Sequence, residues 1–233
     1  MKPPGLFVTG TDTGVGKTYV TAIIARQLVA EGRKVGVYKP AASGCLRKAG
    51  RLVSKDAVTL WNAAGKPGEL DRVCPQLFEA PLAPHLAALA EGRRLDADLL
   101  RLGLDYWRER SEIVLVEGAG GLMSPMGEEE YVADLAEKFG YPLVVVSRNV
   151  LGTINQTLQT LITASVFCSG IAVAGVVMNH PCKPLAGDVS LARNRQELAA
   201  RCVPPILAEV AWNAEGMDRR VDWLGLATEP YIV

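Results

Sequence analysis

LFVTGTDTGVGKT, residues 6 to 18, is the segment that most clearly indicates the architecture of this chain. Its apolar start, Leu6 to Gly10, predicts a buried strand, and the residues from Lys17 to Glu31 predict a helix. The glycine-rich loop therefore joins the end of a strand to the start of a helix. In such a loop, backbone N–H groups surround phosphate oxygens, Lys17 neutralises their charge and the Thr18 hydroxyl can hold Mg²⁺. The sequence predicts a phosphate-binding loop here.

The spacing of this loop departs from the common phosphate-loop pattern at one position. Thr11 stands where the pattern has its first glycine, and Gly10 lies one residue too early. A glycine-rich turn that only joins a strand to a helix is the simpler interpretation. The intact Gly16-Lys17-Thr18 ending and the strand before the loop favour phosphate binding.

Strand and helix patterns alternate along the whole chain. Strands are predicted at residues 6–10, 35–39, 113–117, 143–147, 171–178 and 206–210. Helices are predicted at residues 17–31, 54–64, 84–91, 96–109, 131–139, 152–168 and 187–201. The strands are nearly continuous in apolar residues, which is typical of strands buried on both faces. We therefore predict one α/β domain over residues 1–233, with a P-loop NTPase-like fold: a mostly parallel central sheet with helices on both faces.

The composition excludes partners that bind mainly through an excess of positive charge. The 233 residues contain 25 Lys+Arg and 25 Asp+Glu, so the formal net charge is zero. Neither a nucleic acid nor a membrane surface is therefore an expected partner. The five cysteines are odd in number and form no C-x-x-C pair, and no export signal follows Lys2. These features predict a cytoplasmic protein without a disulfide framework.

One uncharged stretch lies between Arg148 and Lys183, and residues 161–178 within it are long enough to span a bilayer. Its apolar spacing changes partway through, however. One helical face holds Ile154, Leu158, Leu161, Ile162 and Val166. This pattern stops at Gly170, and residues 171–178 then have the pattern of a buried strand. A helix, a glycine stop and a strand explain the stretch better than a membrane span.

Two carboxylates are candidates for a magnesium site beside the phosphate loop. Glu117 ends a strongly apolar strand, and ligands of open α/β sheets bind beyond the carboxyl ends of the strands. Mg²⁺ takes oxygen ligands, usually one or two carboxylates alongside substrate phosphates. Asp56 lies in the first turn of a predicted helix, where an aspartate can equally serve the helix dipole alone. Glu117 can likewise cap a turn, so both alternatives stay open at this point.

Lys39 and Asn179 end, or directly follow, two other predicted strands. A lysine at the carboxyl end of a strand is well placed to face an anion in the crevice, with Ser43 in the small-residue loop that follows. The alternative is an edge lysine whose side chain extends along apolar surface to reach water. Asn179 stands where a side-chain amide can meet the edge of an adenine, and the guanine-type N-K-x-D sequence is absent.

Three motifs together resemble those of the dethiobiotin synthetase family. They are GTDTGVGKT at residues 10–18, YKPAASG at residues 38–44 and VEGAGG at residues 116–121. The resemblance extends to Asp56, residues 78–85, residues 151–155 and the strand end at residues 175–179. It covers the chain from about residue 5 to residue 212, and the longer phosphate loop is itself a feature of that family.

The resemblance implies a homodimeric, Mg-ATP-dependent ligase of biotin synthesis that makes dethiobiotin from 7,8-diaminononanoate and CO₂. The implied catalytic residues are Lys17 and Lys39, which hold the carbamate and the transferring phosphate, and Thr13 and Ser43, which contact the diamine. The implied magnesium ligands are Thr18, Asp56 and Glu117. The residues assigned to ATP and its metal are Gly14, Val15, Gly16, Lys17, Thr18, Asp56, Glu117, Gly118, Ala119, Gly120, Asn179, Val210, Ala211 and Trp212. The residues assigned to the carboxylate tail of the substrate, reaching it from the partner subunit, are Leu151, Gly152, Thr153 and Asn155.

The sequence departs from the family pattern at two positions. Gly14 stands where many relatives carry a glutamate, which removes one contact near the substrate amines. A basic residue found in some relatives is missing at Val150, so backbone N–H groups or Arg148 would capture the carboxylate. Residues 182–201 carry no match to the family.

Two other classes of protein compete with this interpretation. ATPases of the partitioning and cell-division-site type are dimeric switches, but their loops carry a lysine where this chain has Asp12. The chain also shows no amphipathic tail for membrane targeting. A detached synthetase-like domain of an amidotransferase would lack a glutaminase half of about another domain's length. Lys39 and Ser43 have no role in a switch, which favours the synthetase.

Overall fold

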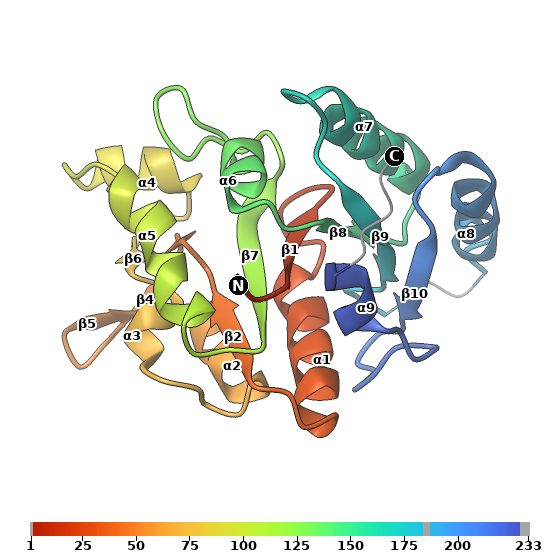
Figure 1. The fold of residues 1–233 in the computed structure, drawn as a ribbon. Helices are drawn as coiled ribbons and strands as arrows, with labels where there is room; N and C mark the ends of the chain where they lie inside the picture. Colours follow the sequence, from red (N-terminus) through yellow and green to blue (C-terminus); the bar gives the residue numbers. More distant parts are fainter. Residues whose placement is uncertain (1, 184–186, 229–233) are drawn as a thin grey trace.

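A parallel six-stranded sheet forms the centre of the molecule (Figure 1). The computed structural model describes residues 2–183 and 187–228. Its strands are β1 (Gly5–Gly10), β2 (Val35–Tyr38), β7 (Ile113–Gly121), β8 (Leu143–Arg148), β9 (Val173–Asn179) and β10 (Ile206–Val210). Their order across the sheet is β10-β9-β8-β1-β7-β2, and every neighbouring pair is parallel. The predicted mostly parallel sheet is confirmed.

Helices cover both faces of this sheet. One face carries α1 (Lys17–Ala30), α2 (Lys55–Ala63) and α9 (Trp223–Thr228), and the other carries α5 (Ala97–Arg108), α6 (Val132–Phe139), α7 (Thr153–Val166) and α8 (Ser190–Arg201). The chain crosses from β1 to β2 in one direction and returns from β2 through β7 to β10 in the other. Because such crossovers are right-handed, the direction of travel decides the face that each helix covers.

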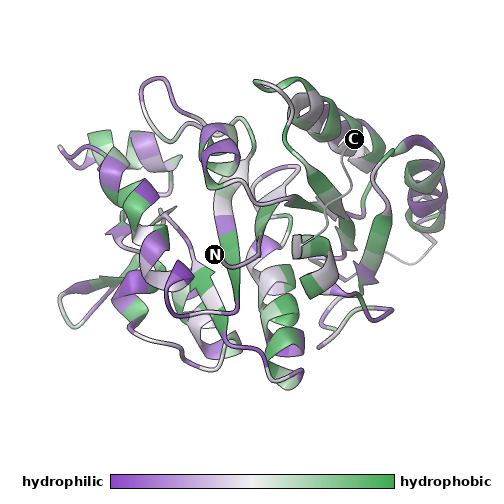
Figure 2. Cartoon of the chain, in the orientation of Figure 1, coloured by the Kyte–Doolittle hydropathy of each residue, from purple (hydrophilic) through white to green (hydrophobic). Residues whose placement is uncertain are grey.

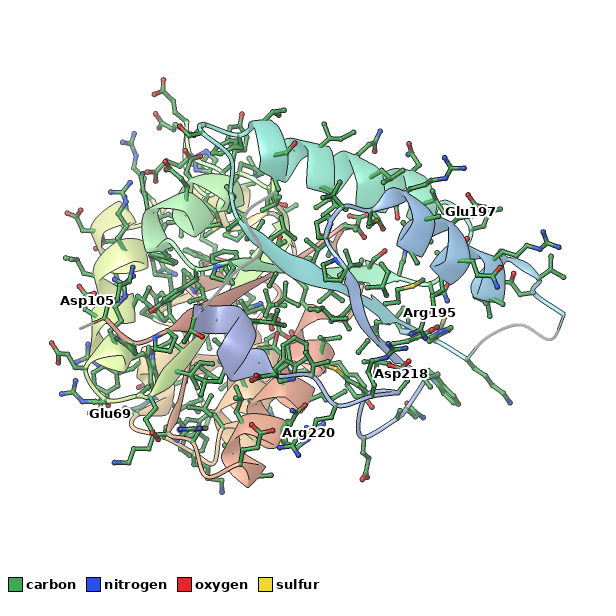
Figure 3. All side chains as sticks on the ribbon, turned by 45° about the vertical axis from the view of Figure 1, so that its right-hand side comes forward. Glu69, Asp105, Arg195, Glu197, Asp218 and Arg220 are labelled. Carbon is green, nitrogen blue, oxygen red and sulfur yellow. The ribbon has the colours of Figure 1, made fainter. Side chains whose placement is uncertain are left out.

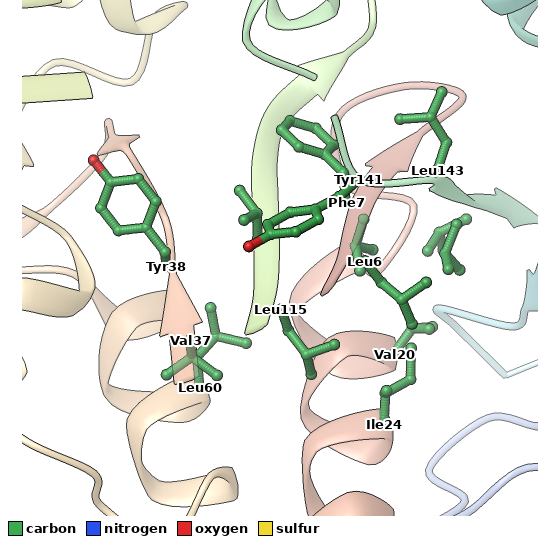
Figure 4. Close-up of a cluster of buried hydrophobic side chains, with 14 of the residues drawn as sticks. Leu6, Phe7, Val20, Ile24, Val37, Tyr38, Leu60, Leu115, Tyr141 and Leu143 are labelled. Carbon is green, nitrogen blue, oxygen red and sulfur yellow. The ribbon is translucent and has the colours of Figure 1, made fainter. Parts of the chain in front are cut away.

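The central strands are apolar because both of their faces are covered. Figure 2 shows them as hydrophobic segments inside a more polar shell. Leu6 and Leu115, on neighbouring strands, are completely buried, and Val20 and Ile24 of α1 pack beside them (Figure 4). Burying each such side chain contributes roughly 1.5–3 kcal/mol. This packing holds the carboxyl ends of the strands, and the loops that follow them, along one edge of the sheet.

Two helices begin at their predicted residues, and a side chain caps each of them. Ser54 Oγ accepts a hydrogen bond from the N–H of Ala57 at the start of α2, and Asp96 Oδ1 accepts one from Leu99 at the start of α5. The shortest elements were not predicted: β3 (Ala41–Ala42), β4 (Leu46–Lys48), β5 (Arg51–Val53), α3 (Leu70–Val73), β6 (Gln76–Leu77) and α9. The four strands have only two or three residues, too few to show a strand pattern, and α3 and α9 span less than two helical turns, too few to show a helix period. Their positions follow from tertiary pairing, such as β3 with β6.

The uncharged stretch forms a helix, a turn and a strand, as predicted. Among the described residues no helix is both long enough and apolar enough to cross a membrane. The helix α7 ends at Val166, Gly170 adopts a left-handed φ of 92°, and β9 begins at Val173. This helix packs on the sheet through small and polar residues, while Ile162 (61% exposed) and Val166 (69%) of the predicted apolar face point outward. The other members of that face, Ile154, Leu158 and Leu161, are half-buried, so only its outer part lies on the surface.

Candidate active site at the carboxyl edge of the sheet

The loop between β1 and α1 is shaped to surround an anion. Gly16 starts α1 with a left-handed φ of 95°, and a Cβ there would collide with the Asn179 side chain, so only glycine fits. No side chain caps this end of α1, and its first turn has no acidic residue. The first backbone N–H groups of the helix thus have no side-chain partner, as a phosphate-binding helix end requires.

Lys17 brings a buried positive charge to this loop. Its side chain is 7% exposed, and its Nζ donates to the carbonyl oxygen of Asp12 at 3.0 Å. Burial is the largest cause that lowers the pKa of Lys17 to about 8; the Lys39 ammonium also lowers it, against the raising effects of Glu117, Asp56 and Asp12. An incoming anion such as phosphate stabilises a buried ammonium of this kind.

Lys39 and Glu117 meet because their strands are neighbours in the sheet. Tyr38 of β2 pairs with Val116 of β7, which brings the two following residues side by side. Lys39 Nζ lies 2.6 Å from Glu117 Oε1 and 3.1 Å from Asp56 Oδ2. Lys39 is 5% exposed, which is incompatible with an edge lysine that reaches water. Asp56, at the start of α2, joins this cluster instead of serving the helix alone.

The cluster keeps Lys39 charged in a buried place. Burial by itself would lower the pKa of Lys39, but the carboxylates of Glu117 and Asp56 outweigh it and raise the pKa above its ordinary value. Lys39 is therefore an ammonium at all physiological pH values. It offers a positive charge for stabilising negative charge at this edge of the sheet, and it does not offer a base.

The oxygen atoms around Glu117 suit a magnesium ion. Glu117 Oε1 accepts hydrogen bonds from Lys39 and, at 2.8 Å, from the Thr18 hydroxyl. Its other oxygen, Oε2, is buried and has no hydrogen-bond partner among the described residues. A buried carboxylate oxygen without a partner is costly unless a cation or donor meets it. In the described residues no cluster of three or more His, Cys, Asp and Glu could hold a metal by itself, so a metal held by Thr18, Asp56 and Glu117 would need further oxygen ligands, such as phosphates.

Asn179 connects the phosphate loop to the end of β9. Its side chain is buried, and its Nδ2 donates to the carbonyl oxygen of Val15 at 2.8 Å. Its Oδ1 is buried and has no partner among the described residues. Val210 pairs with Asn179 across β9 and β10, and Ala211 and Trp212 follow on the surface. One free acceptor and an exposed aromatic ring therefore lie beside the phosphate loop.

The glycine-rich end of β7 forms another wall of the site. Gly118 is buried, whereas Ala119 and Gly120 are half-buried. Gly120 adopts a left-handed φ of 68°, and the Thr13 side chain of the phosphate loop lies beside it. Thr13 and Gly14 are exposed and Ser43 is half-buried. The end of β7 and the phosphate loop therefore lie side by side at Gly120 and Thr13.

The residues predicted to bind the substrate tail lie apart from this cluster in the same chain. Leu151 is 87% exposed, and Gly152 starts α7 with a left-handed φ of 94°. Thr153 is fully buried and its hydroxyl lies 2.6 Å from Ser147 Oγ, so its side chain anchors the helix and is not presented to a ligand. The Asn155 amide donates to Gln159. Within the described part of the chain, no hydrogen bond or ion pair joins these residues to Lys39 or Glu117.

The structure also shows a polar network that the sequence did not predict. Arg195, Glu209 and Asp218 are joined by ion pairs, and His180 hydrogen-bonds Glu209. Charged residues on a surface helix usually indicate a solvated face. The charge pattern of residues 182–201 therefore did not predict that Arg195 pairs with Glu209 and Asp218.

The glycine-rich loop and the buried lysine–carboxylate cluster define a P-loop nucleotide-binding protein. A protein-family model described as an AAA domain matches residues 4–220. The chain is 40% identical over 215 residues to the ATP-dependent dethiobiotin synthetase BioD of Rhodopirellula baltica, covering 88% of this chain and 82% of that protein. It is 36% identical over 218 residues to the protein of the same name from Thermodesulfovibrio yellowstonii, covering 91% and 90%. This chain belongs to the family of ATP-dependent dethiobiotin synthetases, as its motifs predicted.

A solved structure agrees with the fold. The ParA family ATPase of Chlorobium tepidum aligns with a TM-score of 0.52 and 15% sequence identity, covering 92% of this chain and 85% of that one. At that identity the likeness concerns the fold alone and carries no argument for a switch function.

Proposed function

We propose that this protein joins 7,8-diaminononanoate and CO₂ with the hydrolysis of ATP to form dethiobiotin, ADP and phosphate. The observation that carries the proposal is the buried cluster of Lys39, Glu117 and Asp56 beside the phosphate loop. It combines a permanent positive charge with carboxylate oxygens suited to magnesium, which phosphoryl transfer to an anionic acceptor needs. We also propose the cytoplasm as its location, because ATP and bicarbonate are both available there.

The proposed reaction proceeds in three steps. One amine of the diamine adds to CO₂ and loses a proton, giving a carbamate. A carbamate oxygen attacks the γ-phosphorus of ATP, and the bond to ADP breaks. The second amine attacks the carbonyl carbon of this carbamic–phosphoric anhydride, loses its proton and expels phosphate as the ureido ring closes. In these steps the protein mainly aligns the reacting groups and stabilises the negative charge on the carbamate and phosphates.

The proposed roles are those that the family resemblance implies for these side chains. Lys17 neutralises the phosphates, and Lys39 faces the carbamate and the transferring phosphoryl group. Thr13 and Ser43 contact the diamine or its carbamate. A magnesium ion held by Thr18, Asp56 and Glu117 would supply charge neutralisation on the phosphates.

The adenine of ATP is proposed to lie between the ends of β9 and β10. Asn179 supports this placement because its Nδ2 is already committed to Val15, which leaves Oδ1 to accept from the adenine amino group. Val210 to Trp212 lie beside it, where the exposed Trp212 ring, 43% exposed, can cover the base.

The first test measures what ATP turnover requires. We expect phosphate release to depend strictly on both bicarbonate and 7,8-diaminononanoate, because the attacking carbamate needs both. The measurement is released phosphate with each component left out in turn, together with detection of dethiobiotin by mass spectrometry. Equal hydrolysis without the diamine, or stimulation by DNA or lipid vesicles instead, would exclude the synthetase and favour a nucleotide-driven switch.

We propose in addition that two copies of the chain form a homodimer in which Leu151, Gly152, Asn155 and the backbone of Thr153 of one subunit approach the substrate tail in the other. Two apolar residues on the outward side of α7 support this, since Ile162 and Val166 are exposed further along the helix that this segment begins. Exposed apolar faces of this kind commonly pack against a second subunit.

Replacing Ile162 with glutamate tests the dimer. We expect sedimentation velocity to show a monomer, because the change buries a charge in the proposed interface. Leu102→Glu is the matched control, since Leu102 is equally exposed (64%) on α5 and should leave the assembly unchanged. A dimer that survives Ile162→Glu at micromolar concentration would remove α7 from the interface.

A further inference from the structure

The helix α8 carries two adjacent polar residues, Asn194 and Arg195, whose side chains reach different segments at the carboxyl edge of the sheet. Asn194 is 4% exposed, although it lies on a strongly polar helix. Arg195, the next residue, is partly buried by two carboxylates. Buried polar side chains on such a helix require specific partners, and here the partners lie in two loops beside the active site.

Asn194 holds the segment at residues 149–152, which precedes α7. Its Nδ2 donates to Asn149 Oδ1 at 2.9 Å and to the carbonyl oxygen of Val150 at 3.1 Å. Asn149 is itself 2% exposed, and its Nδ2 donates back to the carbonyl oxygen of Leu191 in α8. Hydrogen bonds donated in both directions thus join α8 to the segment that presents Leu151 and Gly152.

Arg195 holds the base of the loop at residues 211–217. Its Nη1 donates to Glu209 Oε2 and to Asp218 Oδ2, each at 2.9 Å. Glu209 and Asp218 close this loop, because Asp218 Oδ1 accepts from the backbone N–H of Glu209 at 2.7 Å and the backbone N–H of Asp218 donates to the Glu209 carbonyl oxygen. Figure 3 shows Arg195 beside Asp218. The base of the loop that carries Trp212 is thus joined to α8 through Arg195, while Tyr19 and Arg26 of α1 hold its far end.

Glu209 also fixes the residue that follows Asn179. Its Oε1 hydrogen-bonds His180 Nε2 and accepts from Asn149 Nδ2. Burial alone would raise the pKa of Glu209, but these hydrogen bonds, together with the one from Arg195, keep the pKa below its ordinary value. Glu209 is therefore a stable anionic partner for Arg195.

We infer that α8 contributes two positioning residues to the reaction: Asn194 sets the segment at residues 149–152 for the substrate tail, and Arg195 sets the loop at residues 211–217 for the nucleotide base. Neither residue touches a ligand; each acts through the loop that it holds. The inference rests on the proposed function, because that function assigns a ligand to each loop. One hydrogen bond, from Asn149 Nδ2 to Glu209 Oε1, connects the segment held by Asn194 with the residues held by Arg195. Neither of the two substitutions tested below removes it.

The test compares Asn194→Ala with Arg195→Ala in the full-length protein with Mg-ATP. We expect Asn194→Ala to raise the KM for 7,8-diaminononanoate about tenfold and to leave the KM for ATP within about twofold, the scale of one or two lost hydrogen bonds. Arg195→Ala should do the reverse. For both variants kcat at saturating substrates should stay within about threefold of the parent, because neither side chain meets the reacting atoms.

The two variants are each other's control, since they are neighbours on one helix and both lose hydrogen bonds. A merely structural role would lower the melting temperature of both and move both KM values together, and that result would overturn the inference. If Asn194→Ala does not fold, Asn194→Asp replaces it, because aspartate keeps the size of the side chain and removes the two donated hydrogen bonds. Arg195→Lys is then the variant compared with it. A parent enzyme that hydrolyses ATP without diamine contradicts the proposed function itself, whereas a diamine-dependent parent without the KM split contradicts only the role of α8.

Discussion

Replacing Lys39 with alanine is expected to lower kcat about a thousandfold while the KM for ATP stays within about threefold. Lys39 is buried and permanently charged, with its Nζ 2.6 Å from Glu117 and 3.1 Å from Asp56. In the proposed reaction its charge stabilises the carbamate and the phosphoryl group during transfer. ATP itself is held mainly by the phosphate loop and Lys17, which the substitution leaves in place. Steady-state kinetics with each substrate varied in turn measures both constants.

The variant Lys55→Ala is the matched control for this prediction. Lys55 precedes Asp56 at the start of α2 but is exposed, so its loss should change neither constant. Because Lys39→Ala leaves two carboxylates without their cation, its folding is checked by thermal melting with and without Mg-ATP. A folded Lys39→Ala protein that turns over at the parent rate would show that Lys39 only neutralises Glu117 and Asp56.

The substitution Glu117→Gln is expected to reduce kcat at least a hundredfold and to raise the magnesium concentration needed for half-maximal activity at least tenfold. Glutamine keeps the shape of the side chain and an oxygen that can accept from Thr18 and Lys39. It removes the negative charge and the buried Oε2 without a partner, which is the atom best suited to meet a cation. Activity measured over a magnesium titration separates this loss of metal affinity from a general loss of rate.

The comparison for Glu117→Gln is Glu112→Gln, which lies just before the opposite end of β7. Glu112 is half-exposed, pairs with Arg33 and accepts from the backbone of Lys34, far from the carboxyl edge of the sheet. Its replacement should leave the magnesium titration unchanged. An identical magnesium requirement for Glu117→Gln and the parent would remove Glu117 from the metal site.

The residues of the phosphate loop could be predicted because their chemistry is local. Gly16, Lys17 and Thr18 follow one another in the chain, and the strand and helix on either side already orient the backbone N–H groups. Asp56 shows the limit of such reasoning. From the sequence it could equally serve the dipole of α2, and only the packing of α2 beside α1 brings its Oδ2 to Lys39.

The positions around α7 and α8 show a second limit. The apolar spacing of Ile154 to Val166 predicted a helical face correctly, but a helical period does not indicate whether that face meets the sheet or the surface. The structure leaves Ile162 outside and buries Thr153 and Thr157 against Ser147. The side chain of Thr153 is therefore an anchor of the segment predicted to bind the substrate tail.

The α/β class, the phosphate-binding loop and the family could be predicted from the residues alone, because each depends on residue types at short, regular spacing. Burial on both faces makes a strand apolar throughout, and phosphate binding requires glycine, lysine and threonine within one loop. Only the tertiary structure decided that Lys39, Glu117 and Asp56 share one charged cluster and that Arg195 holds Glu209 and Asp218. Those partners lie up to 78 residues apart, and they meet because the order of the strands and the direction of each crossover bring their ends to one edge of the sheet. No local pattern encodes that order, since it follows from the packing of the whole chain.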